Sequence, residues 1–248
     1  MADSKQSSPG NEDVNSSTVN QLNVIKSNSR VITGFITRYI LNTTTVINEE
    51  RPKRESFGEK DKSKPHKTIL LVGETGTGKS TVINAMVSYM LGVKCNDKIW
   101  CEIIETKGNQ TDSQTNAVTV HDVFSEASPI SLTIIDTPGF GSTKGKEEDL
   151  KTAETLQMLC QSEISEINAL CLVVSSHAAR LTKTQLYIFN VFLTVFGNDV
   201  EKNIVVFVTH APRKPWNTIN AIKESKVPCA KKDNGDPVYF RFDNFHYM

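Results

Sequence analysis

The chain has 248 residues, with 28 basic and 28 acidic side chains and a hydrophobic fraction of 38%. This charge balance removes the electrostatic argument for nucleic acid as a main partner. The five cysteines are scattered without a C-x-x-C pair, which indicates structural thiols in a reducing compartment and not a disulfide framework or zinc site. The N-terminus lacks the apolar stretch of a signal peptide, and no apolar run approaches the roughly 20 residues of a membrane helix, so we expect a cytoplasmic protein without a transmembrane segment.

Residues 1–64 are predicted to form an N-terminal extension. Residues 1–28 are rich in Ser and Asn, a composition typical of disorder. Residues 30–47 are β-branched and partly alternating, which is compatible with a hairpin, an edge strand or the remnant of a preceding module. Residues 49–66 are charged and contain two prolines, which predicts a solvated linker, with binding through a basic patch as the alternative.

From residue 65 to residue 248 the pattern changes to strands that alternate with helices. Apolar or alternating runs predict strands at 67–72, 98–105, 117–124, 132–135, 169–174, 204–208 and 238–242. Helical periodicity predicts helices at 80–91, 150–167, 182–196 and 216–226. Several strands are apolar throughout, as strands buried on both faces are. The pattern therefore predicts a three-layer α/β fold whose mostly parallel central sheet carries helices on both faces.

The loop between the first of these strands and its helix reads GETGTGKS and matches the phosphate-binding pattern G-x-x-x-x-G-K-[ST] of P-loop NTPases. We predict that it binds nucleotide through Gly73, Glu74, Thr75, Gly76, Thr77, Gly78, Lys79, Ser80 and the following Thr81. The glycines let backbone N–H groups approach phosphate closely at a helix N-terminus. Lys79 can reach the β- and γ-phosphates, and the Ser80 hydroxyl can ligate Mg²⁺.

A second motif, DTPG, follows the strand at 132–135. Asp136 at a strand end suits a contact to Mg²⁺ through water, and the Gly139 N–H can face a γ-phosphate; a plain Pro-Gly turn is the alternative. A switch GTPase also needs a mobile Thr that senses Mg²⁺ and the γ-phosphate. Thr115 is our candidate for this metal-binding and catalytic position, and Thr111 is its competitor.

Phe140 stands where small GTPases place the glutamine that orients the attacking water. An apolar ring cannot polarise water. Hydrolysis is therefore expected to be slow, or another residue supplies this function.

The phosphate loop, DTPG and the run KTILLVGETGTGKSTVINAMVSYMLGV resemble the septin-like branch of GTPases. Within this branch the chain is similar to the G domain of immunity-associated (GIMAP, avirulence-induced-gene type) proteins, to chloroplast-import Toc receptors and to uncharacterised animal proteins, many from fish. The resemblance covers residues 65–244 and implies a G domain over 65–248 that binds GTP or GDP with Mg²⁺. It also implies a slow or dimer-activated GTPase switch. The family continues into a C-terminal helix, so the resemblance suggests a truncated chain.

The guanine-specificity motif [NT]-K-x-D is altered in this sequence. Thr209, His210 and Pro212 occupy its Thr, Lys and Asp positions, and proline lacks the acceptor that guanine needs. Toc receptors have Thr-His-Ala at the same place, and this resemblance implies that His210 packs against the base; capping of a strand end is the alternative. Asn244 resembles the last base-side motif of the family.

Arg180 occupies the place of an Arg-[FY]-Thr motif in the immunity-associated proteins. The resemblance implies a homodimer or oligomer through the nucleotide face, in which Arg180 stabilises charge on the partner's phosphates. An exposed arginine before a helix N-cap at Thr182 is the alternative.

Two other functions remain open from the sequence alone. Pro212 favours an ATPase or nucleoside kinase, because the guanine contact is missing. Phe140 and the missing C-terminal helix favour an interaction module that binds nucleotide without turnover.

Overall fold

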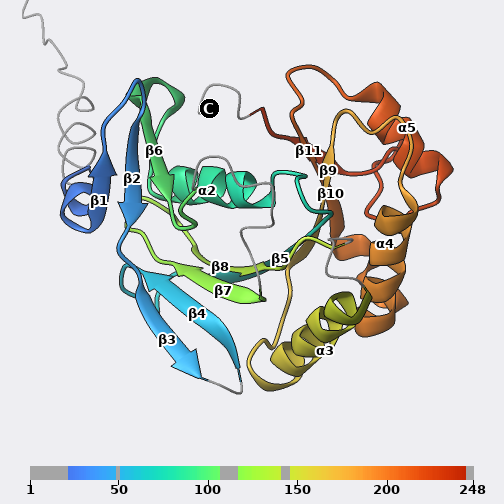
Figure 1. Cartoon of the computed structure of the whole chain (residues 1–248), viewed down its shortest axis with the longest axis horizontal. Helices are drawn as coiled ribbons and strands as arrows, with labels where there is room; N and C mark the ends of the chain where they lie inside the picture. Colours follow the sequence, from blue (N-terminus) through green and yellow to red (C-terminus); the bar gives the residue numbers. More distant parts are fainter. Residues whose placement is uncertain (1–21, 49–50, 107–116, 141–145, 244–248) are drawn as a thin grey trace, which may run out of the picture.

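A computed structural model of the chain describes residues 22–48, 51–106, 117–140 and 146–243 (Figure 1). Its centre is an eight-stranded sheet. The strands, in order across the sheet, are β11 (Tyr239–Arg241), β10 (Ile204–Thr209), β9 (Ala169–Ser175), β5 (His66–Val72), β8 (Ser131–Asp136), β7 (Thr119–Val123), β4 (Arg51–Phe57) and β3 (Thr44–Asn48). Neighbouring strands are parallel except for the pairs β7–β8 and β3–β4. The predicted α/β fold with a mostly parallel sheet is confirmed.

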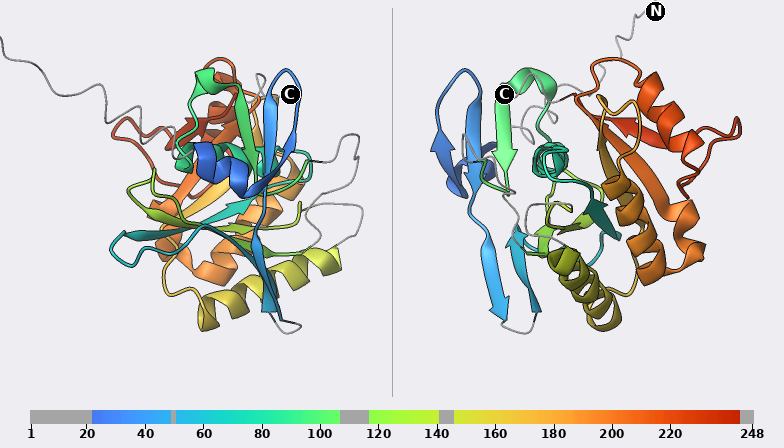
Figure 2. Two further views of the ribbon diagram at one scale, coloured as in Figure 1. Left: turned by 90° about the vertical axis from the view of Figure 1, so that its left-hand side faces the viewer. Right: turned by 45° about the vertical axis from the view of Figure 1, so that its right-hand side comes forward.

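Helices cover both faces of this sheet (Figure 2). They are α2 (Lys79–Met90), α3 (Lys146–Ser162), α4 (Lys183–Phe196) and α5 (Trp216–Glu224), with short 3-10 helices η1 (Cys95–Asp97) and η2 (Asn198–Asn203). Leu70 and Val72 of β5 are buried in one core with α3, α4 and α5, whereas Leu71 is buried in the other core with α2. Successive strand residues face opposite sides of a sheet, so an apolar run such as β5 supplies two cores at once.

A second, three-stranded sheet lies on the α2 side of the molecule (Figure 2). Its strands are β1 (Ser29–Ile32), β2 (Thr37–Leu41) and β6 (Ile99–Glu102), with β2 antiparallel to β1 and parallel to β6. Tyr39 and Leu41 are buried in the core that α2 shares with the large sheet. A hairpin predicted within residues 30–47 is present as β1–β2, but the chain then leaves it, and β3 joins the edge of the large sheet.

The prediction of a solvated linker over residues 49–66 is wrong for β4. This strand runs parallel to β7 inside the large sheet. Arg54, near its middle, donates from Nε and from a terminal nitrogen to both carboxylate oxygens of Asp122 on β7, at 2.6 and 3.1 Å. Charge, which suggested solvation in the sequence, is instead paired across the sheet. The predicted disorder over residues 1–28 is also wrong in part, because residues 22–27 are helical and Ile25 is buried.

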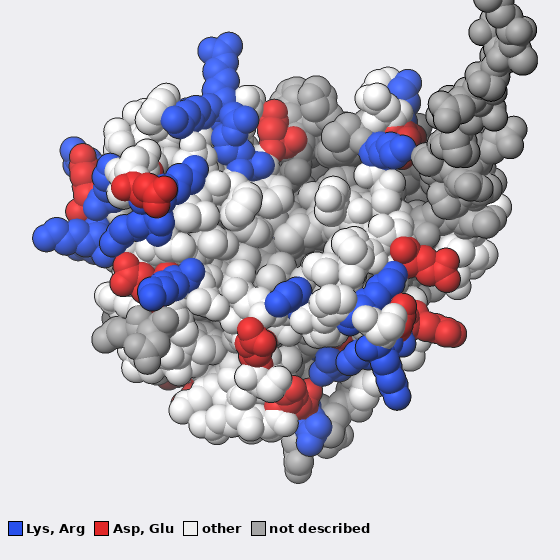
Figure 3. Space-filling view, turned by 180° about the vertical axis from the view of Figure 1, so that it is seen from behind, with Lys and Arg blue, Asp and Glu red and all other residues white. Residues whose placement is uncertain are grey.

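The surface carries both signs of charge. Figure 3 shows Lys and Arg side chains intermixed with acidic ones at the edge that α5 forms, while much of the centre of that face is uncharged. Lys223 pairs with Asp236 and Lys231 with Glu201 at this edge. Within the described ranges, none of the helices combines the length and apolar character needed to cross a membrane.

Candidate functional site

The loop from Gly73 to Ser80 forms the turn between β5 and α2. Gly76 and Gly78 have φ angles of 80° and 85°, in the left-handed region that glycine adopts without strain. A Cβ on Gly73 would lie 2.5 Å from the Val173 carbonyl oxygen, so this residue packs directly on β9. Gly78 is the N-cap of α2 and provides no side-chain cap. The first N–H groups of α2 are therefore available to an anion that lies along the positive end of the helix.

Lys79 is the buried cation of this loop. Its side chain is 7% exposed, and its ammonium donates to the carbonyls of Gly73 at 2.9 Å and Glu74 at 3.1 Å. Burial lowers the pKa of Lys79 from 10.5 to about 8, while the carboxylates of Asp136 and Glu74 oppose this drop. A buried ammonium held beside uncapped N–H groups is suited to bind phosphate.

Asp136 ends β8 and is 1% exposed, and its charge acts on Lys79. Ser80 follows Lys79 in the first turn of α2. A hydroxyl and a carboxylate are the oxygen ligands that Mg²⁺ takes when phosphate and water complete its shell. Among the described residues, no group of three or more His, Cys, Asp or Glu side chains is arranged to hold a metal ion. The oxygen atoms of Ser80 and Asp136 fit a magnesium site that phosphate and water complete.

The segment after β8 lies directly against the phosphate loop. The Phe140 N–H donates to the Gly73 carbonyl at 3.2 Å, and the Thr75 N–H donates to the Phe140 carbonyl at 3.4 Å. The Thr75 hydroxyl donates to the Gly139 carbonyl at 3.2 Å. A Cβ on Gly139 would lie 2.6 Å from the Thr75 Cα, so this approach requires glycine. Gly139 thus contacts the loop whose phosphates it is predicted to sense.

The ring of Phe140 belongs to the core that α3, α4 and α5 share with the sheet. It is 2% exposed and packs edge-on against Phe192 of α4, with ring centroids 5.5 Å apart. At this position the structure has a core residue and not a water-orienting one. The sequence identified the missing glutamine but not the packing role of its replacement.

Thr209 and His210, at the end of β10, lie next to the phosphate loop. The Thr209 hydroxyl donates to the Thr77 carbonyl at 2.7 Å. A Cβ on Gly78 would lie 3.6 Å from Cε1 of the His210 ring. His210 has a φ of 51°, and its buried Nδ1 has no hydrogen-bond partner among the described residues. Strained backbone and an unused buried polar atom are typical of a ligand site, so His210 fits a place beside the nucleotide.

A second histidine, His177, lies beside His210 and was not predicted from the sequence. The His177 ring lies 6.1 Å from the His210 ring, and the neighbouring Ser176 hydroxyl donates to the His210 carbonyl. His177 lies in the loop after β9, and nothing in the sequence pattern links it to position 210.

The loop after β9 also carries Arg180, which is exposed. Thr182 is the N-cap of α4, as the alternative interpretation of Arg180 expected, and its hydroxyl contacts Glu74 of the phosphate loop at 2.5 Å. Arg180 lies two residues before this contact with the phosphate loop.

The remaining predicted residues are less informative. Thr81 lies in the first turn of α2 and is partly buried. Thr115, its competitor Thr111 and Asn244 lie outside the described residues.

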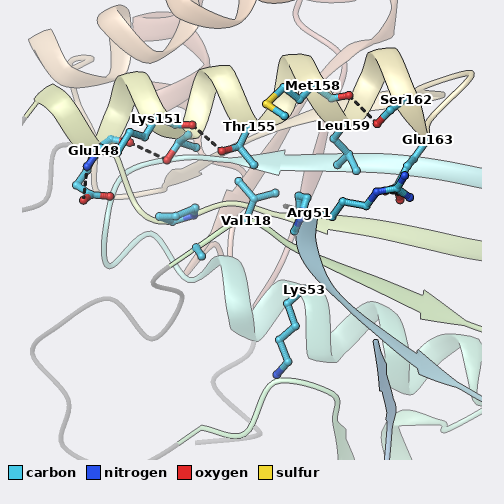
Figure 4. Close-up of a pocket in the computed structure, with 14 residues that line it drawn as sticks. Arg51, Lys53, Val118, Glu148, Lys151, Thr155, Met158, Leu159, Ser162 and Glu163 are labelled. Carbon is cyan, nitrogen blue, oxygen red and sulfur yellow. Dashed lines mark hydrogen bonds and ion pairs between the residues drawn. The ribbon is translucent and has the colours of Figure 1, made fainter. Parts of the chain in front are cut away.

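A groove of about 500 Å³ lies between α3 and the start of β4 (Figure 4). Val118 and Leu159 line it with buried side chains, and the hydroxyls of Thr155 and Ser162 donate to carbonyls one turn earlier in α3. Its basic side chains are ion-paired: Arg51 with Glu163, Lys53 with Glu55, and Lys151 with Glu148. No residue of the phosphate loop lines this groove. The basic side chains described in the groove are already ion-paired, so we do not assign the nucleotide site to this groove.

Comparisons with known proteins agree with this geometry. The model of the AIG1 family matches residues 67–222. A search of the curated proteins found no match. Among solved structures, the chain is similar to a dimerisation-deficient arginine-to-alanine mutant of Toc33 from Arabidopsis thaliana. The two sequences are 15% identical and the TM-score is 0.52. The alignment covers 74% of this chain and 72% of that chain. Toc33 with Mg²⁺ and GMPPNP is 14% identical at a TM-score of 0.50, with the same coverage.

A third structure aligns equally well. It comes from work showing that dimerisation is important for the GTPase activity of the chloroplast translocon components atToc33 and psToc159. It is 14% identical to this chain at a TM-score of 0.52. The alignment covers 74% of this chain and 72% of that chain. These likenesses establish that this chain shares its fold with those GTPases.

Proposed function

On the premise that this chain belongs to the AIG1 family, we propose that it is a Mg²⁺-dependent GTP-binding protein that hydrolyses GTP slowly and is activated by dimerisation through its nucleotide face. The observation that carries this proposal is the buried Lys79 ammonium within a glycine loop, next to uncapped N–H groups of α2. The Toc33 structures with Mg²⁺ and nucleotide, and the work on Toc33 dimers, support it.

Phosphate binding follows from this arrangement. The β-phosphate lies on the N–H groups of the loop and of the α2 N-terminus, where the helix dipole favours negative charge. The Lys79 ammonium then exchanges part of its bonding to the Gly73 and Glu74 carbonyls for phosphate oxygens. Ser80 would ligate Mg²⁺ directly and Asp136 through water, with Thr115 as the third residue. Mg²⁺, when bound, would neutralise charge on the phosphates.

Guanine recognition is assigned to the residues that follow β10. The Thr209 hydroxyl joins the end of β10 to Thr77, and a Cβ on Gly78 would lie 3.6 Å from the His210 ring. His210 is proposed to pack against the base. Asn244 is proposed to complete the base side. Pro212 cannot accept hydrogen bonds from the guanine edge, so guanine preference here is expected to be weaker than in GTPases with an aspartate at this position.

Hydrolysis needs positioned water and stabilised charge on the γ-phosphate. Gly139 is proposed to bind the γ-phosphate through its N–H. Because the Phe140 ring is in the core, this residue does not orient the attacking water. A single protomer is therefore expected to hydrolyse GTP slowly. Arg180 of one protomer is proposed to supply the missing positive charge to the phosphates of the other.

A binding titration tests the nucleotide assignment. GTP, GDP and ATP are titrated against the protein with Mg²⁺ and with chelator, by calorimetry. We expect GTP and GDP to bind in a Mg²⁺-dependent manner, and ATP to bind at least about tenfold more weakly, the discrimination that about 1.4 kcal/mol provides. Equal affinity for ATP would assign the chain to the ATPase class, and no binding of any nucleotide would refute the proposal.

One observation favours a second function, an interaction module that binds nucleotide without turnover. Phe140 occupies the glutamine position, and its ring is buried and apolar, so it cannot orient the attacking water. The two functions differ in whether turnover rises with protein concentration, because only the dimer-activated enzyme accelerates.

The cytoplasm is the proposed location. The four cysteines whose side chains the structure describes are free thiols, as expected in a reducing compartment. Burial raises the pKa of Cys101 to about 12 and the pKa of Cys171 further still, which keeps both thiols protonated and unreactive. Fractionation of cells that express the tagged chain checks this location.

A further inference from the structure

A side-chain hydrogen bond joins two loops of the site that are 108 positions apart in the sequence. The Thr182 hydroxyl donates to the Glu74 carboxylate at 2.5 Å. Glu74 belongs to the phosphate loop, and Thr182 begins α4 directly after the loop that carries Arg180. We infer that Thr182, anchored on Glu74, is a positioning residue that sets where Arg180 stands relative to the nucleotide face; this inference rests on the proposed dimer-activated function.

Thr182 is held firmly on its own side. Its hydroxyl accepts the Gln185 N–H at 3.0 Å, and its N–H donates to the Gln185 side chain at 2.9 Å, which forms a capping box. The hydroxyl has one proton, and that proton goes to Glu74. Thr182 is thus bonded both to the first turn of α4, through Gln185, and to the phosphate loop, through Glu74.

Glu74 is held equally firmly. Its carbonyl accepts from the Lys79 ammonium at 3.1 Å and from the Thr77 hydroxyl at 2.8 Å, and its backbone forms a bridge with Phe140. Its carboxylate accepts from the Thr182 hydroxyl, so Glu74 links the phosphate loop to α4.

Arg180 lies two residues before this fixed point and is exposed. No hydrogen bond or ion pair joins its guanidinium to another described residue, so it is available to a second molecule. A long side chain that acts across an interface depends on the placement of its backbone, and a displacement of about 1 Å can cost up to about 100-fold in rate. The Glu74–Thr182 bond supplies this placement.

Substitutions at Thr182 separate positioning from helix capping. In Thr182→Asp the aspartate still caps α4 but has no proton to donate and repels Glu74. Thr182→Ser keeps both the cap and the donor, and is the matched control. GTP turnover is measured over a range of protein concentrations, together with GDP affinity and thermal unfolding, for both variants, Arg180→Ala, and Arg180→Ala combined with Thr182→Asp.

We expect Thr182→Asp to keep the wild-type melting temperature, GDP affinity and turnover at low concentration, but to lose most of the acceleration at high concentration, about ten- to 100-fold. Thr182→Ser should accelerate like the wild type. The double variant should be no slower than Arg180→Ala, because both changes act through the same arginine.

Acceleration of Thr182→Asp at the wild-type level, or a double variant slower than Arg180→Ala, overturns the inference while the proposed function stands. Absence of any acceleration in the wild type, or full acceleration in Arg180→Ala, refutes the proposed dimer mechanism and this inference with it.

Discussion

Lys79 shows how one residue can be costly to the fold and necessary to the site. Its ammonium is 7% exposed and is stabilised by two backbone carbonyls and the nearby Asp136. These partners do not compensate fully for lost hydration, since the pKa falls to about 8. Phosphate would restore the missing negative charge, and the protein therefore carries an electrostatic penalty that its ligand relieves.

This penalty predicts how the stability of the nucleotide-free protein depends on pH. Between pH 8 and 10.5 the folded protein binds fewer protons at Lys79 than the unfolded chain does, so the free energy of unfolding rises as the pH increases through this window. The full rise attributable to Lys79 is about 3 kcal/mol. Urea unfolding at several pH values should show this slope in the wild type, and the slope should be reduced in Lys79→Met.

Lys151→Met is the matched control for this measurement. Its side chain is 68% exposed, so its removal should leave the wild-type slope unchanged. Equal slopes in the wild type and Lys79→Met would show that Lys79 is not desolvated in the free protein.

At the scale of elements, β4 shows that the N-terminal extension is part of the main sheet. The seam between β4 and β7 is polar: Asp122 has a side chain only 5% exposed and accepts from Arg54 and, at 2.5 Å, from the Thr133 hydroxyl. Arg54 also donates to Glu163 at the end of α3, at 3.2 Å. Hydrogen bonding to Asp122 raises the pKa of Arg54 against the opposing effect of burial. One arginine thus ties the extension to a strand and a helix of the domain.

Arg54→Ala should therefore destabilise the whole protein and not only its N-terminal part. The change leaves the Asp122 carboxylate buried without its cation, and removal of one partner from such a pair costs about 3 kcal/mol. Chemical denaturation should show a lower midpoint in one cooperative transition.

Arg51→Ala is the control within the same strand. Arg51 pairs with the same Glu163, but its side chain is 58% exposed, so its loss should cost less than about 1 kcal/mol. Similar losses for the two variants, or a separate early transition for the extension, would contradict the structural role of β4.

At the scale of the whole molecule, three other segments contact the phosphate loop at one end of the sheet. The phosphate loop contacts the Gly139–Phe140 segment through backbone hydrogen bonds, the Thr209 loop through Thr77, and the Arg180 loop through Glu74. Parallel strands end at the same edge, so these loops form one face. A second copy that covers this face would meet the phosphates and Arg180 together.

We expect this face to mediate dimerisation that depends on the nucleotide. Sedimentation velocity should show a monomer without nucleotide and a concentration-dependent dimer with a transition-state analogue and Mg²⁺. Arg180→Ala should weaken the dimer by about tenfold or more, as loss of a charge-assisted contact of about 1.5–3 kcal/mol implies. An Arg180→Ala dimer of unchanged affinity would exclude Arg180 from the interface.

The sequence by itself determined the α/β fold and the phosphate loop, because both depend on local patterns. Strand and helix periodicities identified the strands and α-helices from β5 to β11 but not η1 or η2, and Gly73 to Ser80 form the predicted turn between β5 and α2. These features need no knowledge of distant partners, since their residues are adjacent in the chain.

Only the tertiary structure decided which distant residues meet. The sequence predicted that Arg54 belongs to a solvated linker, whereas the structure pairs it with Asp122 of β7, 68 positions away. The sequence showed only that Phe140 replaces a water-orienting glutamine, whereas the structure shows that its ring packs against Phe192 in the core. The contact of Thr182 with Glu74 spans 108 positions. Charge and polarity in a sequence report what a side chain would prefer in water, and only packing determines whether a partner replaces that water.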